Sequence, residues 1–287
     1  MSKTIAAAKK DLYIGVDLGG TNVRAGRVKN GKILDLQKRP ISSHAGWKIV
    51  LEEICETIGK VLEPKVKGIG ICVPSLVKNG VVYNAANIPS WKEVPVQKLL
   101  EKRFHLPVRV NNDAKCFVLG EMHYGFGRGH TNLVGLIIGT GLGCGVIING
   151  KLYSGTNGGA GEIGHVPYQA EEFEYYCSGR FFQREFGLDA TEVEKRAETG
   201  DFKAAEMLAK FGDHFGDVIM AVLYAYDPEL IVLGGGVSRA YPYFEKRMRE
   251  KLVKFRFQNA LKKLKIVQTK KPNIAVLAAA ALFLDKP

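Results

Sequence analysis

Three glycine-rich turns follow apolar segments, and each has the composition of a backbone-lined site for an anion. The first is Asp17-Leu-Gly-Gly-Thr-Asn22, after the apolar residues 12–16. The second spans 138–145 and the third 233–237, each after another apolar run. Glycine lacks a Cβ, so backbone N–H groups in such turns can approach phosphate oxygens closely. Three turns of this kind predict three points of backbone contact with a nucleotide.

Two common nucleotide motifs do not match these turns. Gly15 and Gly20 have the spacing of a P-loop, but Thr21 and Asn22 stand where that motif needs Lys and Ser or Thr. In the second turn, Cys144 takes the place of the third glycine of a dinucleotide fingerprint. Each turn alone is also compatible with a simple hairpin or strand-to-helix bend. The prediction therefore depends on all three together.

Acidic, amide and imidazole side chains stand at two further places. Asp113 follows two asparagines, and Glu162 and His165 lie in a segment with glycines at 161 and 164. A carboxylate can take the proton of a hydroxyl nucleophile, and Glu and His can hydrogen-bond to hydroxyl groups. Asp113 also fits an ordinary helix N-cap, and a lone Glu or His is usually a surface residue.

The elements that must position these residues alternate between strands and helices. We predict strands at 12–18, 22–29, 32–39, 66–73, 107–110, 133–138, 145–148, 151–153, 230–233 and 265–267. We predict helices at 47–62, 94–104, 113–124, 202–225, 241–254 and 275–284. Both halves of the chain begin with strands joined by a glycine-containing bend, which indicates a duplicated α/β unit. Mixed sheets covered by helices on both faces then bind ligands at their strand ends, between the two units.

Composition and charge limit the function classes. The 287 residues suffice for two domains, and 46% hydrophobic with 24% charged residues is ordinary for a globular protein. Lys and Arg exceed Asp and Glu by 41 to 29, a net charge of +12, but the basic residues are dispersed. An anionic substrate explains this charge as well as nucleic acid does, and we expect no nucleic-acid partner.

Targeting and redox signals are weak. No apolar run approaches the ~20 residues of a membrane helix, so we expect no membrane partner. Residues 1–10 contain only the short apolar stretch 5–8, which indicates a short leader rather than a signal peptide. The five cysteines form no Cys-x-x-Cys pair, which fits buried thiols in a reducing cytoplasm. We expect a cytoplasmic protein.

The motifs together resemble the ROK family of sugar kinases, within the actin/hexokinase/Hsp70 superfold. The resemblance runs from Tyr13 to about Leu284. It rests on Asp17-Leu-Gly-Gly-Thr21, Asn112-Asp113-Ala114, Gly139-Thr-Gly-Leu-Gly-Cys-Gly145, Gly161-Glu-Ile-Gly-His165, Ser178-Gly179, Leu233-Gly-Gly-Gly236 and the alanines 278–281. It implies an α/β fold of two ribonuclease H-like (actin-like ATPase) domains with mixed sheets flanked by helices and an interdomain cleft. We expect a smaller domain of 1–112 plus 272–287 and a larger domain of 113–271.

The family pattern also implies roles for single residues. It makes Asp113 the catalytic base that takes a proton from a sugar hydroxyl as the γ-phosphoryl group of ATP is transferred. Asp17 would organise Mg²⁺ through water. The residues expected at the phosphates are Gly19, Gly20, Thr21, Thr140 and Gly141, and those at the adenosine are Gly234, Gly235 and Gly236. The residues expected at the sugar are Asn87, Asn112, Asp113, Glu162, His165 and Glu174.

The segment after His165 departs from the family pattern. Most members carry three cysteines there, which bind zinc together with that histidine. Here Glu174 follows only nine positions later with no cysteine between, and Cys177 alone cannot replace three thiolates. We predict ATP and Mg²⁺ as cofactors and no structural zinc. Glu174 keeps its expected role because Glu174-Tyr-Tyr-Cys-Ser-Gly179 still matches the family's Glu-x-x-x-Ser-Gly.

The resemblance leaves the sugar open. We expect phosphorylation of glucose at O6, whereas kinases for N-acetylmannosamine, N-acetylglucosamine, fructose or allose share the same motifs. A non-catalytic sugar sensor is disfavoured by Asp113. A transcriptional repressor of the family would carry a helix-turn-helix ahead of the strand that starts at Leu12, and we expect none. Related kinases are often dimers, so a homodimer is a possible assembly.

Overall fold

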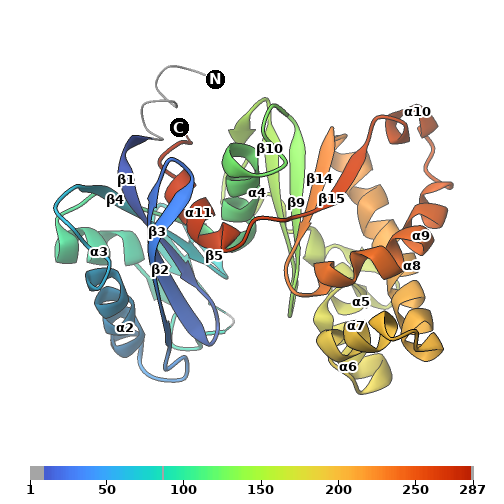
Figure 1. Cartoon of the computed structure of the whole chain (residues 1–287), viewed down its shortest axis with the longest axis horizontal. Coiled ribbons are helices and arrows are strands. Elements are labelled where there is room, and N and C mark those ends of the chain that lie inside the picture. Colours follow the sequence, from blue (N-terminus) through green and yellow to red (C-terminus); the bar gives the residue numbers. More distant parts are fainter. Residues whose placement is uncertain (1–9, 86, 286–287) are drawn as a thin grey trace. The chain divides into compact units, whose positions relative to one another are not determined.

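The computed structural model describes residues 10–85 and 87–285. They form two compact units (Figure 1). Unit 1 contains the described residues up to Arg128, the segment 151–160 and the chain from Lys271. Unit 2 contains 129–150 and 161–270. Of the predicted leader, only Lys10 is among the described residues.

Unit 1 is built on a mixed five-stranded sheet with the order β3-β2-β1-β4-β8. Its strands are β1 (Leu12–Leu18), β2 (Asn22–Lys29), β3 (Lys32–Pro40), β4 (Val66–Val73) and β8 (Val108–Asn112). The β1, β2 and β3 strands form antiparallel hairpins, whereas β1, β4 and β8 are parallel neighbours. These positions agree with the predicted strands, and the prediction of a mixed sheet is confirmed.

The two faces of this sheet carry different residues. On one face, Ile14 and Val16 of β1 belong to a core with α2 (Trp47–Gly59) and α3 (Val96–Phe104). On the other face lies α11 (Ile274–Ala281). A Cβ on Gly15 would lie 1.9 Å from the backbone oxygen of Val276 in α11, so that side chain must be absent. Gly15, between Ile14 and Val16, therefore lets the alanine-rich helix pack onto the sheet.

Helix α4 (Asp113–Tyr124) packs with unit 1 through α11. A Cβ on Gly120 would lie 2.7 Å from the Cβ of Ala278, so the two helices touch along small residues. The two compact units thus do not follow the predicted boundary after Asn112, because α4 and the segment 151–160 belong to unit 1. That segment begins with the short strand β11 (Lys151–Leu152).

A second, three-stranded antiparallel sheet of unit 1 was not predicted. It consists of β5 (Leu76–Lys78), β6 (Val81–Tyr83) and β7 (Glu93–Val94). Strands of two or three residues are too short for an alternating pattern to stand out from the surrounding turns. Trp91, which is fully buried, joins this sheet to the main core.

Unit 2 has a mixed sheet that includes the run β10-β9-β14-β15. Its strands are β9 (Leu133–Ile138), β10 (Leu142–Ile148), β14 (Leu230–Gly234) and β15 (Lys265–Gln268). The expectation that the second glycine turn extends to Gly145 is wrong. Leu142 already pairs with Ile138 in an antiparallel hairpin, so only 139–141 form the turn.

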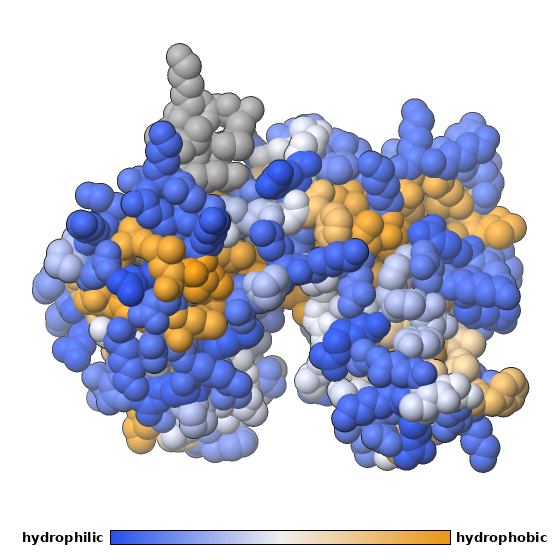
Figure 2. Space-filling model, viewed as in Figure 1, coloured by the Kyte–Doolittle hydropathy of each residue, from blue (hydrophilic) through white to orange (hydrophobic). Residues whose placement is uncertain are grey.

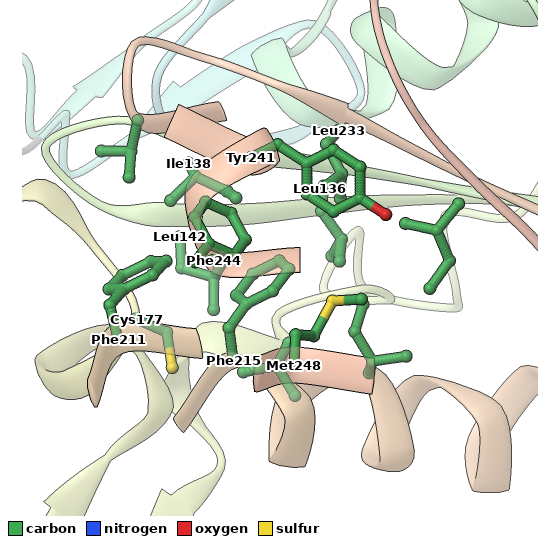
Figure 3. Close-up of a cluster of buried hydrophobic side chains, with 14 of the residues drawn as sticks. Leu136, Ile138, Leu142, Cys177, Phe211, Phe215, Leu233, Tyr241, Phe244 and Met248 are labelled. Atoms are coloured by element: carbon green, nitrogen blue, oxygen red, sulfur yellow. The ribbon is translucent and has the colours of Figure 1, made fainter. Parts of the chain in front are cut away.

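Helices cover this sheet with a core rich in phenylalanine. They are α5 (Phe173–Tyr176), α6 (Gly179–Phe186), α7 (Ala190–Glu198), α8 (Phe202–Tyr226), α9 (Tyr241–Leu252) and α10 (Gln258–Leu261). Figure 3 shows strand side chains such as Leu136 and Leu233 facing Phe211 and Phe215 of α8 and Phe244 of α9. The long helices α8 and α9 were predicted, whereas α5, α6, α7 and α10 were not.

The surface of the described residues is mainly hydrophilic on the face shown in Figure 2, with smaller separate apolar areas. Individual large apolar side chains are exposed in both units, for example Leu34 and Val253. Within 10–85 and 87–285, no helix combines the length and the apolar character needed to cross a membrane.

Candidate active site

The carboxyl ends of the three parallel strands in unit 1 bring several predicted site residues to one edge. Asp17 of β1 pairs in register with Cys72 of β4, and Cys72 with Asn111 of β8. Neighbouring strands lie about 4.8 Å apart, so this edge is about 10 Å wide between β1 and β8. Burial raises the pKa of the Cys72 thiol, and the charges of Asp17 and Asp113 raise it further. Both carboxylates therefore lie within electrostatic reach of one buried sulfur.

Asn112, and not Asp113, is the N-cap of α4. Its Oδ1 accepts from the backbone N–H groups of Ala114 at 3.0 Å and Lys115 at 3.2 Å, and its amide donates to Ser75 O at 3.3 Å. Asp113 is the first helical residue, with Oδ1 accepting from Ala114 N at 2.8 Å. The helix N-terminus favours a negative charge there. The capping explanation for Asp113 is therefore wrong, because its neighbour has that role.

Asp17 is held by a residue that the sequence analysis missed. Arg24 of β2 donates to Asp17 Oδ2 from Nε at 2.9 Å and from Nη2 at 2.5 Å. Its Nη1 donates to Asn273 Oδ1 at 3.3 Å, next to α11. Asp17 and Arg24 lie opposite each other across the first hairpin. A prediction of the hairpin register would therefore have found this pair. This two-pronged contact fixes the carboxylate at the end of β1.

The first glycine turn closes the β1–β2 hairpin. Gly19 N donates to Asn22 O at 2.9 Å, and Thr21 is exposed at the tip. A Cβ on Gly20 would lie 2.8 Å from the Cβ of Asn87, so the turn packs against that residue. The structure therefore brings Asn87, expected at the sugar, beside the phosphate turn predicted from the sequence.

A pocket of about 430 Å³ opens beside this turn within unit 1. Its lining residues are Asp17, Gly19, Thr21, Asn22, Arg24, Leu36, Lys38 and Asn273. Two of them are basic, Arg24 and Lys38, and only Asp17 is acidic. Backbone N–H groups next to such cationic side chains make a concave site suited to an anion.

Lys115 of α4 is a buried cation that the sequence analysis also missed. It is 1% exposed, and its Nζ donates to the backbone oxygen of Gly158. Its position inside the apolar segment 114–119 is the sequence feature that could have indicated its burial. The contact ties the segment 151–160 to the helix that begins with Asp113.

In unit 2, the second glycine turn is held by Glu174. Glu174 Oε2 accepts from Leu142 N at 2.9 Å, and Arg180 lies 3.9 Å from Oε1. A Cβ on Gly141 would lie 2.4 Å from Glu174 Oε2, so a side chain there would displace this carboxylate. Thr140 at the tip is exposed. The structure thus joins Glu174, expected at the sugar, to the turn expected at the phosphates.

The third turn lies beside the second in the same unit. Gly235 has φ +84, and a Cβ on it would lie 2.4 Å from Ile138 O at the end of β9. Gly234 is the last residue of β14, and Gly236 precedes a 3₁₀ turn at Val237–Ala240. Because β14 and β9 are parallel neighbours, two of the three predicted glycine turns meet at one sheet edge.

The predicted sugar segment of unit 2 presents polar side chains from a turn. Glu162 is exposed and precedes the 3₁₀ turn Ile163–His165. His165 Nδ1 lies 3.0 Å from Glu172 Oε2. The hydrogen bond to Glu172 raises the pKa of His165 and outweighs the opposing effect of burial. His165 is 61% exposed, so its imidazole keeps a face for a ligand.

In the described part of the chain, no three His, Cys, Asp or Glu side chains gather as metal ligands. A single carboxylate such as Asp17 is suited to Mg²⁺ that keeps its water and is held mainly by phosphates. The absence of structural zinc stays a prediction.

Comparison with known proteins identifies the protein family. The ROK family model matches residues 13–286. A glucokinase from Thermotoga maritima is 32% identical over 84% of this chain and 87% of its own length. An N-acetyl-D-glucosamine kinase from Salmonella heidelberg is 30% identical, covering 79% and 84%. Both similarities extend over most of each chain.

A solved structure is similar along the same length. The crystal structure of a ROK family glucokinase from Streptomyces griseus, in complex with glucose and AMPPNP, has a TM-score of 0.82 and 27% identity. The similarity covers 94% of this chain and 98% of that one. The predicted α/β fold of the actin-like ATPase class is thereby confirmed. On the family match and the identities above, the chain belongs to the ROK family.

Proposed function

We propose that the protein is an ATP-dependent hexose kinase that transfers the γ-phosphoryl group to a sugar hydroxyl, with glucose O6 as the preferred acceptor. The observation that carries the proposal is the placement of Asp113. Its carboxylate stands at the start of α4 while Asn112 caps the helix. The relatives named glucokinase and N-acetyl-D-glucosamine kinase support the same reaction class.

Asp113 acts as the general base in this proposal. A sugar hydroxyl is a weak nucleophile, and a carboxylate within hydrogen-bond reach takes its proton as the bond to phosphorus forms. Asn112 is the N-cap of α4, and Asp113, the first helical residue, accepts from Ala114 N through Oδ1. Asn112 has a second amide hydrogen beyond the one given to Ser75, and that hydrogen is the donor we assign to the sugar.

The donor nucleotide is held by the three glycine turns. Gly19, Gly20 and Thr21 bind phosphate oxygens in unit 1, next to the basic pocket with Arg24 and Lys38. Thr140 and Gly141 bind phosphates in unit 2, and Gly234, Gly235 and Gly236 lie against the adenosine.

The Mg²⁺ of the nucleotide is assigned to Asp17, through water. Both Arg24 bonds end on Oδ2, and Oδ1 accepts no hydrogen bond from the described residues. That oxygen fits a metal-bound water, and Mg²⁺ when bound neutralises charge on the transferred phosphate. Arg24 keeps Asp17 in place for this contact.

The acceptor sugar is assigned to Glu162, His165 and Glu174, together with Asn87 and Asn112. Carboxylate, imidazole and amide groups exchange hydrogen bonds with ring hydroxyls and so orient one of them toward the base. One oxygen of Glu174 already accepts from Leu142 N, and Arg180 lies 3.9 Å from the other. N-acetylglucosamine is the second candidate acceptor, on the strength of the Salmonella relative.

An ADP-release assay over a panel of hexoses and N-acetylhexosamines tests the proposal. We expect the highest kcat/KM with glucose and a product phosphorylated at O6, identified by phosphorus and carbon NMR. A higher kcat/KM with N-acetylglucosamine transfers the assignment to the second candidate. ADP release with none of the sugars, in a folded protein that binds ATP, refutes the kinase proposal and favours a non-catalytic sugar sensor.

The proposal also includes a cellular compartment and an oligomeric state. All five cysteines are buried free thiols, which fits work in the reducing cytoplasm. A homodimer is proposed as the assembly, and sedimentation at micromolar concentration distinguishes it from a monomer.

A further inference from the structure

The segment 161–178 of unit 2 carries Glu162, His165 and Glu174, three of the proposed sugar residues. Its first part rests directly on β10. A Cβ on Gly161, which has φ +90, would lie 2.4 Å from Cys144 O, and one on Gly164 would lie 2.5 Å from Leu142 O. These contacts fix the backbone around Glu162. They do not reach the following hairpin, β12 (Pro167–Tyr168) and β13 (Glu171–Glu172).

Tyr168 attaches this hairpin to helix α8. Its hydroxyl donates to Asp217 Oδ2 at 2.6 Å and lies 3.2 Å from His214 Nδ1. Because the only hydroxyl hydrogen goes to Asp217, the imidazole contact requires a hydrogen on Nδ1 of His214. Lys251 of α9 pairs with the same Asp217 oxygen at 3.1 Å. The tyrosine oxygen thus links the hairpin to α8, and Asp217 in turn links α8 to α9.

Aromatic rings enclose these polar contacts. Tyr168 stacks on Phe173 at 4.6 Å between centroids, and Tyr176 and Phe181 lie 5.0 and 5.7 Å from the His214 ring. The Asp217 side chain is 19% exposed. A charge-assisted hydrogen bond in such partly dry surroundings is stronger than one in water. The rings and the carboxylate together form what we call the Tyr168 anchor, consisting of Tyr168, Phe173, Tyr176, His214 and Asp217.

The Tyr168 anchor is connected to the proposed sugar residues by short paths. Phe173, stacked on Tyr168, begins α5, and the next residue is Glu174. Glu172 faces Pro167, the neighbour of Tyr168, and its carboxylate holds His165 Nδ1 at 3.0 Å. A displacement of Tyr168 therefore moves the partner of His165 and the helical turn that carries Glu174.

We propose that Tyr168 is a positioning residue that orients His165 and Glu174 for the sugar through its contacts with Asp217 and His214. The inference rests on the proposed function, because it assigns a sugar role to those two residues. The family pattern implies a zinc ion with three cysteines in the segment after His165. In this chain, which lacks those cysteines, the hydrogen-bonded aromatic anchor supplies the fixed point.

Tyr168→Phe is the test, because it removes the hydroxyl and keeps the ring. Tyr241→Phe is the matched control. Tyr241 is also in unit 2, is 7% exposed, and donates to Glu245 Oε1 at 2.9 Å on α9, with no part in the Tyr168 anchor. Asp217→Asn is the second variant, since it keeps the size of the partner and removes its charge.

Three quantities are measured on the full chain. Hydrogen exchange of the backbone amides in 161–178 reports the anchor without any ligand. Calorimetry gives the dissociation constants for glucose and for ATP, and steady-state assays separate kcat from KM. For Tyr168→Phe we expect amide exchange in 161–178 to be about tenfold faster and glucose affinity to be about fivefold to tenfold weaker, because one hydrogen bond to a charged group is lost. We expect kcat to stay within about threefold of wild type. We expect ATP affinity to stay unchanged, and Tyr241→Phe to match wild type in exchange and in glucose binding.

The outcomes separate this proposal from the one on which it rests. If wild type binds glucose and Tyr168→Phe binds it equally well, Tyr168 has no positioning role, while the proposed function stands. Faster exchange with unchanged glucose affinity refutes the role in the same way and leaves only a structural contact. If wild type binds no sugar of the panel, the proposed function is refuted and the positioning role fails with it.

Discussion

The pair Asp17–Arg24 gives a prediction whose size can be worked from the structure. Arg24→Met removes both hydrogen bonds to Asp17 Oδ2, at 2.9 and 2.5 Å, and leaves a carboxylate that is 15% exposed without its cation. Hydrogen bonds to charged groups contribute about 1.5–3 kcal/mol when buried. Arg24 is 34% exposed, so solvent screening reduces this gain. We expect the free energy of unfolding to fall by about 1–2 kcal/mol, and Tm by about 2–8 °C.

Arg103→Met is the control for this prediction. Arg103 lies 3.3 Å from Glu52 in the same unit, with side-chain exposures of 60% and 57%. Ion pairs that exposed contribute little, so we expect a change within about 0.5 kcal/mol. Thermal and urea unfolding of both variants give the comparison.

Nucleotide binding provides the functional half of the same test. Arg24 lines the basic pocket beside the first glycine turn, and Arg103 does not. We expect Arg24→Met to weaken ATP binding about tenfold in calorimetry, the loss of one charge-assisted contact. Equal unfolding curves and equal ATP affinities for Arg24→Met and Arg103→Met would refute the assignment of Arg24.

Three further predictions concern packing, pH and metal. Gly70→Ala places a Cβ 1.9 Å from Ala279 O, and we expect it to lower the free energy of unfolding by about 3 kcal/mol or more. Gly59→Ala is its control: the space around that Cβ is open, so we expect the substitution to stabilise helix α2 by up to about 1 kcal/mol. We expect NMR titration to give a His165 pKa above 6.5, and a lower one in Glu172→Gln. Because the folded-state pKa is raised, the His165–Glu172 pair stabilises the fold below pH 6.5, and this contribution is lost as the pH rises through the raised pKa. Atomic absorption of purified protein finds less than about 0.1 zinc per chain, and EDTA leaves Tm unchanged; stoichiometric zinc would contradict the reading of the segment after His165.

Much of the fold followed from periodicity. The strands of both main sheets and the helices α2, α8 and α9 have long repeating patterns, and the structure has them within a few residues of the predicted positions. The short strands β5, β6 and β7 and the helix α5 span two to four residues, where no period can be read. The predicted domain boundary after Asn112 placed helix α4 in the second domain, whereas its small residues pack on α11.

The candidate site was predictable to the extent that motifs marked its residues. The glycine turns and Asp113 were found from local composition, and the structure gathers Asp17, Asn112 and Asp113 at one sheet edge. Arg24 escaped because a lone arginine on a strand has no motif, and its role depends on the hairpin register. The Tyr168–Asp217 contact escaped because the two residues are 49 positions apart in the chain.

The most direct measurement of the central proposal is single-turnover phosphoryl transfer by Asp113→Asn, compared with Asp189→Asn. Asp189 is the exposed N-cap of α7, and asparagine caps equally well, so that control should keep wild-type rates. We predict that Asp113→Asn retains glucose and ATP affinity within about threefold and loses about 10²–10⁴ in the rate of transfer. A rate close to wild type in Asp113→Asn would contradict the assignment of the base.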